Sequence, residues 1–354
     1  MHVSLIRPAE LGPSDIQAWR SMQLETNSLV NPFLCPEYAM GVGEVQPAAR
    51  VAVLTEGSRV IGFFPFERSK FDAGAAIGGG LSNCQGLIHA PGAEWDAREL
   101  LKACKLSTWK FNELTQDQKP FERYATDQTR AYLIDLSNGH EAYEESIRLK
   151  SPKFVKSMSQ KARKLEKDFG EVRWAADTRD MADLRLFMSW KSDQCKRNGW
   201  LDIFARPWVV DLIDRLFATR TDSFGCAISV LYAGETPVAT EISFRSRHYV
   251  VAWHSAYDLE FGRYAPGLIR YSFAVKQMAA AGVHLYEMGD EDFMDRFTNN
   301  IAYFMKGTVT AGPLAASVHR AQSVSSNYAR RTIKRFPFVY RAADSVLQRM
   351  GKIA

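Results

Sequence analysis

The stretch Pro237–Gly307 decides the fold, and three short runs carry its pattern: Trp253-His254-Ser255-Ala256-Tyr257-Asp258, then Tyr264-Ala265-Pro266-Gly267-Leu268, then Glu287-Met288-Gly289-Asp290. A strand over His248–Tyr257 is followed by a helix that begins at Pro266 and ends near Gly282, and then by a short buried strand over Val283–Met288. Pro is favoured at a helix start because its missing N–H would be unpaired there anyway, and Gly is a common stop. The stretch therefore predicts a strand–helix–strand unit.

The first strand of this unit alternates along its whole length. Strict alternation predicts one face with Tyr249, Val251, Trp253 and Tyr257, and an opposite face with Val250, Ala252, His254 and Ala256.

This order of elements resembles the part of the GNAT acyltransferase fold where two neighbouring parallel strands splay apart. In that fold the helix between the strands points its N-terminus at the pyrophosphate of an acyl-CoA, and free N–H groups with the helix dipole suit such an anion. The resemblance implies acetyl-CoA or another acyl-CoA as co-substrate and no metal. It also implies a cofactor-binding set of Arg263, Tyr264, Pro266, Gly267 and Leu268.

A closer resemblance is to the CelD/BcsL-like branch of GNAT proteins, the BioF2-like acetyltransferase domain, which is associated with cellulose and other exopolysaccharide synthesis. Its matches are Asn31-Pro32-Phe33-Leu34 with Pro36-Glu37-Tyr38, Leu81 to Ile88, the basic helix around Lys153 to Leu165, and the series Ala256-Tyr257-Asp258, Pro266-Gly267 and Glu287-Met288-Gly289. The chain departs from the branch at Phe293-Met294, where the family commonly has a Tyr-Lys pair.

Length and composition describe an ordinary globular protein. The 354 residues suit two domains, 46% of them are hydrophobic and 24% charged, and the net charge of +5 does not favour nucleic acid as a partner. There is no run of 18 apolar residues and no signal-like start, so we expect a cytoplasmic protein. The five scattered cysteines fit free thiols and imply no metal site.

A hairpin pattern occurs twice. The run Val51–Phe66, with a turn at Glu56–Arg59, has a counterpart in Cys226–Phe244, with a turn at Ala233–Glu235. The repetition predicts two copies of one α/β unit. Together with the resemblance, this implies an α/β (α+β) fold of tandem GNAT-like domains, each with a mixed central sheet flanked by helices. We place the first domain at residues 1–140, the acyltransferase domain at 141–312, and a basic helical tail at 313–354.

Acyl transfer from a thioester needs a base for the attacking group and an acid for the leaving thiolate. The candidate bases on or beside the two strands are Glu287, His254, Glu241 and Asp290, and the candidate acid is Tyr257. A free imidazole has a pKa of about 6.5 and can accept a proton at neutral pH. Each of these side chains has a structural alternative as well, in a hydrogen bond, an ion pair or the core.

The segment Arg148–Lys167 carries eight Lys or Arg residues against Glu166 alone. Such a run is most often a solvated face, and the sharper alternative is an acceptor-binding set of Lys153, Lys156, Lys161 and Lys164 for an anionic substrate. The basic tail either lies on the inner face of an anionic membrane or packs on the second domain.

The resemblance implies an acyl-CoA-dependent transferase, with acetyl as the expected acyl group. The acceptor expected from the resemblance is an amine or hydroxyl of a sugar or lipid-linked saccharide in cell-envelope or exopolysaccharide synthesis. Two alternatives remain open. One is an aminoacyl-tRNA-dependent peptidoglycan transferase, because FemABX proteins resemble the chain in layout. The other is a non-catalytic binding protein, which the departure at Phe293-Met294 allows.

Overall fold

The computed structural model describes residues 1–69 and 72–312. Its strands are β1 (His2–Ile6), β2 (Ala49–Glu56), β3 (Arg59–Arg68), β4 (Ala73–Ala76), β5 (Ile88–His89), β6 (Thr108–Leu114), β7 (Ala125–Asp135), β8 (Val172–Thr178), β9 (Arg220–Thr221), β10 (Phe224–Ala233), β11 (Thr236–Ser246), β12 (Tyr249–Tyr257), β13 (Leu285–Gly289) and β14 (Asn300–Thr310). Its α-helices are α1 (Pro13–Glu25), α2 (Pro36–Val45), α3 (Ala97–Ala103), α4 (Lys119–Glu122), α5 (Gly139–Lys150), α6 (Pro152–Phe169), α7 (Met181–Asn198), α8 (Pro207–Ala218) and α9 (Pro266–Ala280).

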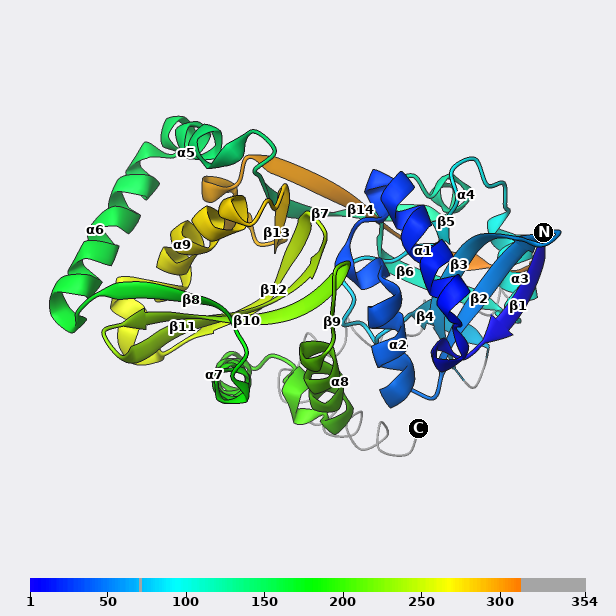
Figure 1. Ribbon diagram of the computed structural model, residues 1–354, viewed down its shortest axis with the longest axis horizontal. Coiled ribbons are helices and arrows are strands. Elements are labelled where there is room, and N and C mark those ends of the chain that lie inside the picture. Colours follow the sequence, from blue (N-terminus) through cyan, green and yellow to red (C-terminus); the bar gives the residue numbers. More distant parts are fainter. Residues whose placement is uncertain (70–71, 313–354) are drawn as a thin grey trace, which may run out of the picture.

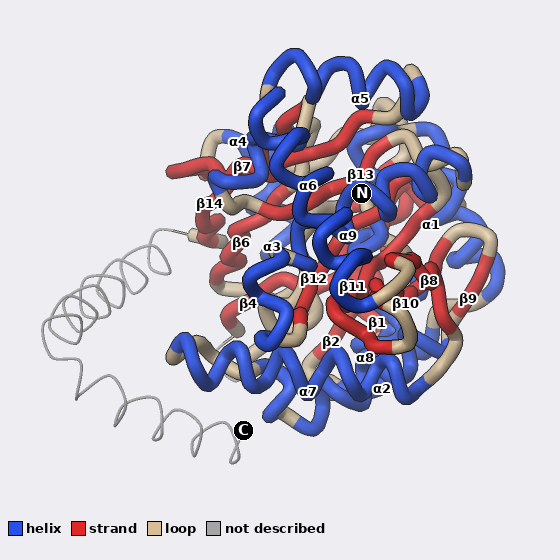
Figure 2. The backbone as a smooth tube through the Cα atoms, turned by 90° about the vertical axis from the view of Figure 1, so that its left-hand side faces the viewer, coloured by secondary structure: helices blue, strands red, loops and turns tan. Residues whose placement is uncertain are grey.

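The described strands form one continuous mixed sheet in the order β1-β2-β3-β4-β6-β14-β7-β13-β12-β11-β10-β8, with β5 beside β3 and β9 beside β10 (Figure 1). Helices cover both faces of the sheet, and Figure 2 shows the strands between α5 on one side and α2, α7 and α8 on the other. The hairpins β2–β3 and β10–β11 confirm the predicted repeat, and their turns contain Gly57 and Gly234 at positive φ.

The two halves of the chain repeat one connectivity. In the first half β4 and β6 are parallel and α3 lies between them in sequence, and in the second half β12 and β13 are parallel and are joined through α9. The last strand of each half crosses into the other: β7 pairs with β13, β14 pairs with β6, and β7 and β14 pair with each other at the centre. This exchange explains why two α/β units share a single sheet.

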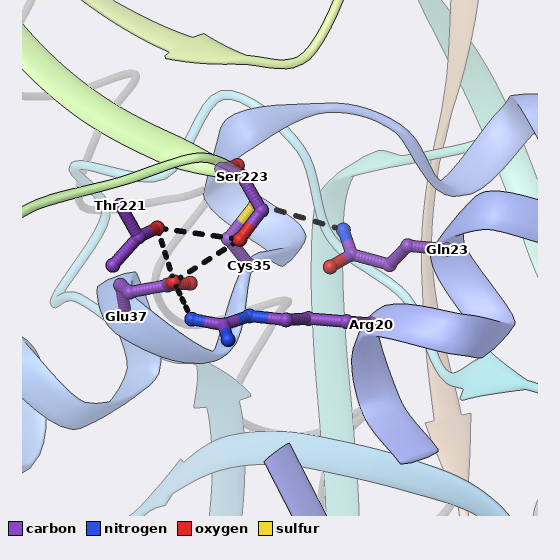
Figure 3. Close-up of polar contacts among 6 residues, drawn as sticks. All are labelled: Arg20, Gln23, Cys35, Glu37, Thr221 and Ser223. Atoms are coloured by element: carbon purple, nitrogen blue, oxygen red, sulfur yellow. Dashed lines mark hydrogen bonds and ion pairs between the residues drawn. The ribbon is translucent and has the colours of Figure 1, made fainter. Parts of the chain in front are cut away.

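Helices and polar side chains also join the halves. Helix α2 of the first half packs against α8 of the second, and both contribute to one hydrophobic core. Beside that contact Glu37 is buried and accepts hydrogen bonds from Arg20, from Thr221 at 2.7 Å and from Ser223 at 3.3 Å (Figure 3). The carboxylate therefore ties α1 and α2 to the turn after β9.

Strand β12 departs from the predicted alternation. His254 lies opposite Ile242 on β11 and Ala252 lies opposite Ser243, so Trp253 is an extra residue in a β-bulge. Because the bulge shifts the alternation by one residue, Ala256 packs in the same core cluster as Trp253. The predicted placement of Ala256 on the opposite face from Trp253 was therefore wrong.

The other elements of the deciding stretch are as predicted. Helix α9 begins at Pro266, the chain turns at Gly282 with φ 71°, and β13 follows. The five cysteines are free, as predicted, and all five are buried. Within the described residues no helix is long and apolar enough to cross a membrane. The predicted basic tail at 313–354, with its membrane contact, lies outside the described residues.

Candidate active site

The parallel strands β12 and β13 separate after three residue pairs. Tyr249 lies opposite Leu285, Val250 opposite Tyr286 and Val251 opposite Glu287. Beyond Val251, no strand of the described chain pairs with this edge of β12, while β13 stays paired with β7. The bulge at Trp253 lies directly after the point of separation, where it redirects the following side chains. The backbone N–H and C=O groups along this open edge are available to a ligand.

A pocket of about 720 Å³ occupies the opening. Its walls from β12, the loop after β4 and the α7 side are Asn83, Lys191, Gln194, Cys195, Trp200, Leu201, Ile203, Ala252, Trp253, His254, Ser255 and Tyr257. Its walls from the α9 side and the end of β13 are Gly262, Ala265, Gly267, Leu268, Arg270, Tyr271, Met288, Gly289, Asp290, Glu291, Phe293 and Met294. Since Tyr271 and Trp253 belong to cores on opposite faces of the sheet, the pocket is a passage through it.

The N-terminus of α9 forms one end of the passage. Ala265 adopts a left-handed conformation with φ 54°. Its carbonyl accepts hydrogen bonds from the backbone amides of Leu268 and Ile269. Gly267 lies in the wall, and a Cβ there would be 3.5 Å from Cδ1 of Tyr257, which is an ordinary contact. This end of the passage combines a helix N-terminus with a residue that has no side chain, which suits an anion.

The predicted cofactor-binding residues divide into two groups. Gly267 and Leu268 line the passage, and Pro266 is buried at the helix start. Arg263 and Tyr264 have other partners, because the buried Tyr264 hydroxyl accepts from Arg263 at 2.5 Å and donates to Asp168 on α6 at 2.5 Å. These two side chains fasten the 3₁₀-helix η5 (Leu259–Tyr264) to α6, and neither is in the wall of the passage, so their role as ligand contacts stays a prediction.

Glu287 is the last residue of β13 that pairs with β12, so it lies next to the point where the strands separate, although its side chain is not in the wall of the passage. Its side chain is buried, and its Oε2 accepts hydrogen bonds from the Tyr249 hydroxyl at 2.6 Å and from Asn31 Nδ2 at 3.2 Å. Burial raises the pKa of Glu287 to about 7, the Tyr249 hydrogen bond acts against this, and the charge of Glu113 adds to it. A carboxyl group with a pKa near neutrality is suited to exchange protons at physiological pH.

The structure gives Glu241 a structural role. It is 1% exposed, forms an ion pair with the equally buried Arg270, and accepts a hydrogen bond of 2.5 Å from the Tyr286 hydroxyl. Both of its oxygens are therefore occupied by donors. We correct the prediction of Glu241 as a base, because a carboxylate held by a buried guanidinium is not free to take a proton.

His254 lies in the wall of the passage, as its sequence position suggested. Burial and, to a smaller extent, the nearby charge of Lys191 lower its pKa to about 3. An imidazole with that pKa is neutral at physiological pH and a weak base, because the ideal catalytic pKa lies near the operating pH. Asp290 and Tyr257 also line the passage, as do Phe293 and Met294, the two residues that depart from the family pattern.

The four predicted acceptor lysines lie on α6, at the outer edge of the second half (Figure 1). None of them is in the wall of the passage. Lys161 Nζ donates to the carbonyl of Arg263 at 3.2 Å, and Lys164 Nζ lies 6.0 Å from the ring centroid of Tyr264. Lys161 and Lys164 therefore stand beside η5, close to the start of α9. Lys153 and Lys156 are exposed nearer the start of α6.

Among the described residues of the first half, a loop occupies the place of the equivalent opening. The loop that contains Gln85 runs beside the end of β6. The backbone amide of Gln85 donates to the Glu113 carbonyl at 2.8 Å, and its carbonyl accepts from the Thr115 amide at 2.9 Å. This loop fills the place that corresponds to the opening after β12. Its neighbour Asn83 reaches the passage of the second half, and Trp253 Nε1 donates to the carbonyl of Leu81 at 3.1 Å. The first half thus contributes a wall to the site of the second.

Sequence reasoning missed Lys191, Arg270 and Tyr249. Lys191 and Arg270 line the passage, and Tyr249 holds Glu287. Lys191 stands among other charged residues of an amphipathic helix, and nothing in the pattern of α7 distinguishes it. The sequence held one signal for Arg270. It is a charged residue on the side of α9 that is otherwise apolar and includes Ile269 and Ala274.

Comparison with known proteins agrees with this geometry. Residues 152–297 match the family model described as an acetyltransferase (GNAT) domain. No curated protein matches the sequence.

Among solved structures, FemX superposes with a TM-score of 0.55 at 10% identity, over 81% of this chain and 94% of its own. The C-terminal domain of a predicted lysylphosphatidylglycerol synthetase from Agrobacterium fabrum gives 0.53 at 9% identity, over 88% and 95%. A tandem GNAT protein from the clavulanic acid biosynthesis pathway gives 0.48 at 11% identity, over 88% and 99%. At such identities the likeness concerns the fold alone. The predicted fold class, tandem GNAT-like α/β units, is confirmed.

Proposed function

We propose that this protein is an acyltransferase that takes an acyl group, in the first instance acetyl, from acyl-CoA at the opening between β12 and β13. The observation that carries the proposal is the passage itself, which joins an open strand edge to the N-terminus of α9. The open edge offers backbone groups to the amides of the pantetheine arm, and the helix N-terminus offers positive potential to the pyrophosphate. The acyl thioester then lies near the point where the strands separate, and the acceptor enters from the opposite face.

In this proposal Glu287 acts as the base. A protonated amine cannot attack a thioester, so the acceptor first gives a proton to Glu287, directly or through a water molecule. The neutral amine nitrogen then forms a bond to the thioester carbon, the carbon–sulfur bond breaks, and the nitrogen gives up a second proton as the thiolate leaves. Tyr257 stands in the passage beside Gly267, where its hydroxyl can give a proton to the thiolate and regain one from the nitrogen.

The acceptor is proposed from the resemblance to the CelD/BcsL-like branch, as an amine or hydroxyl of a sugar or lipid-linked saccharide of the cell envelope or an exopolysaccharide. The passage is compatible with such a molecule, because its α7 side combines the exposed Trp200 with the amides of Asn83 and Gln194. Aromatic faces and amide groups together bind amphipathic rings that carry hydroxyls.

Replacement of Gly267 tests the place of the donor. We expect Gly267→Val to weaken acetyl-CoA binding about 10- to 100-fold, the size of a lost charge-assisted hydrogen bond, because its branched side chain covers the helix start. Isothermal titration calorimetry measures the affinity. Gly267→Ala is the matched control, since the added Cβ meets only an ordinary contact 3.5 Å away and should keep most of the affinity. Wild-type affinity for acetyl-CoA in Gly267→Val would contradict the placement of the donor site at the start of α9.

One observation favours a second candidate, an aminoacyl-tRNA donor. The basic side chains of α6 stand beside η5, next to the proposed donor end of the passage, where a polyanion would meet them. Titration with tRNA at two salt concentrations separates the candidates. A tRNA donor predicts tight, salt-dependent binding that four Lys→Glu changes at Lys153, Lys156, Lys161 and Lys164 abolish. An acyl-CoA donor predicts that acetyl-CoA binds and tRNA does not compete.

A further inference from the structure

Two cationic side chains face the passage with hydrogen-bonding capacity to spare. Arg270 is 1% exposed and uses Nη1 for its ion pair with Glu241, while its Nε is buried and has no hydrogen-bond partner in the described part of the chain. Leaving a buried donor without a partner is costly, so such atoms in native proteins call for an explanation. The position of Arg270 in the pocket wall offers one, since a ligand can supply the acceptor.

Lys191 is the second cation. Its Nζ donates to Gln194 Oε1 at 3.0 Å and to the Ser255 carbonyl at 3.3 Å, and both partners are neutral. Among the described residues no carboxylate forms an ion pair with it. Burial lowers the pKa of Lys191, and the charge of Arg270 also lowers it. Cys195 and Glu291 act on the Lys191 pKa in the opposite direction. Lys191 and Arg270 both line the same passage.

An anion bound between Lys191 and Arg270 would give each of them a hydrogen-bond acceptor that it lacks. An ammonium has three N–H donors, of which Lys191 uses two, and the Nε–H of Arg270 is unused. A group with two oxygens could accept one charge-assisted hydrogen bond from each, and its charge would offset the cost of keeping two cations close together away from water. The phosphates of acyl-CoA are assigned to the start of α9, so this anion belongs to the acceptor.

We propose that the acceptor carries a carboxylate, which Lys191 and Arg270 bind through their two free N–H groups. This inference rests on the proposed acyl transfer and names the chemical class of its acceptor, an amine that bears a carboxylate. Asp290 and Glu291 line the passage on the β13 side and favour the ammonium end of such a molecule. Arg270 and Lys191 are then specificity residues, and Glu241 with Tyr286 positions Arg270.

Matched pairs of acceptors test the proposal. Muramic acid is glucosamine with an added lactyl group that carries a carboxylate, and 4-aminobutyrate has a carboxylate where 4-aminobutanamide has a neutral amide. With acetyl-CoA as donor and thiol release as the readout, we expect the acid of at least one pair to have a KM about 10- to 100-fold lower than its neutral partner. Lys191→Gln and Arg270→Lys should each reduce that ratio toward one. Arg270→Lys keeps a positive charge opposite Glu241 and replaces the guanidinium, with its unpaired Nε donor, by an ammonium group.

Lys196→Gln is the matched control, because Lys196 lies on the same helix but is exposed and paired with Asp193, so the ratio should not change. Thermal unfolding shows whether each variant folds, and Lys191→Gln alone decides the question if Arg270→Lys does not. Equal KM values for acid and neutral acceptors overturn the proposal. So does an equal loss of kcat for both members of a pair in Lys191→Gln, because the anion would then be the oxyanion of the reaction.

Calorimetric titration with muramic acid and glucosamine in the absence of donor separates this inference from the proposed function. Binding of muramic acid that depends on Lys191, without any acyl transfer, supports the carboxylate site and contradicts the acyltransferase. Acyl transfer without preference for the acid supports the acyltransferase and contradicts the carboxylate site. If no pair of acceptors shows either binding or transfer, both the carboxylate site and the acyltransferase activity are contradicted.

Discussion

Replacement of Glu287 by Gln is expected to lower kcat/KM for an amine acceptor by about 100-fold, the lower end for loss of a positioned base. The variant keeps the shape of the side chain and removes its ability to take a proton. In the wild-type enzyme only the deprotonated carboxylate is active, so kcat/KM should fall as the pH decreases through the Glu287 pKa of about 7. In Glu287→Gln this acidic limb should be absent. Full turnover with an unchanged pH profile would exclude Glu287 as the base.

Two neighbours provide controls that move the limb in opposite directions. The Tyr249 hydroxyl stabilises the carboxylate and lowers the pKa of Glu287, so Tyr249→Phe should move the limb to higher pH. The charge of Glu113 raises that pKa, so Glu113→Gln should move the limb to lower pH. A purely structural Glu287 would give no such opposed shifts. His254→Gln should leave the limb in place, because the low pKa of His254 keeps it neutral throughout this range.

Removal of Glu241 should have the largest effect on stability. We expect Glu241→Ala to reduce the free energy of unfolding by about 3–5 kcal/mol, because it leaves Arg270 charged, buried and unpaired. Urea denaturation followed by circular dichroism measures the change. The double replacement Glu241→Leu with Arg270→Met should recover much of the loss, since it removes both charges and fills the space with apolar groups.

The matched control is Glu235→Ala. Its partner Arg173 lies 3.7 Å away in an exposed pair, and pairs of that kind contribute little. A comparable loss of stability in both variants would show that burial of the Glu241–Arg270 pair has no special importance. A small loss in Glu241→Ala would contradict the structural role given to Glu241 and reopen it as a base.

The local parts of the fold could be predicted from the sequence. The turn glycines of the two hairpins, the proline at the start of α9 and the apolar run of β13 act within a few residues, and periodicity detects them. The exchange of β7 and β14 could not be predicted, because their partners are separated by more than 150 residues of sequence. The bulge at Trp253 was also missed, since the sequence alternates without interruption there, and only the pairing with β11 shows the extra residue that changes the faces of the side chains after it.

The site was predictable in its framework and not in its electrostatics. Gly267, Leu268, Asp290, His254 and Tyr257 line one passage because they flank a strand–helix–strand unit that the sequence indicates. The roles of Glu241 and Glu287 depend instead on partners distant in sequence: Arg270 is 29 residues from Glu241, and Asn31 is 256 residues from Glu287. Two buried carboxylates on the strands that flank β12 therefore have different environments, and only the folded structure distinguishes the ion-paired group from the one with a raised pKa.

Hydrogen–deuterium exchange with and without acetyl-CoA tests the central claim most directly, because it needs no knowledge of the acceptor. The account predicts slower exchange in residues 252–257 of β12, whose open edge would pair with the pantetheine arm, and in the first turn of α9. The β2–β3 hairpin is far along the sheet and should exchange at the same rate in both samples. No change in exchange at saturating acetyl-CoA, or protection confined to other elements, would contradict a donor site between β12 and β13.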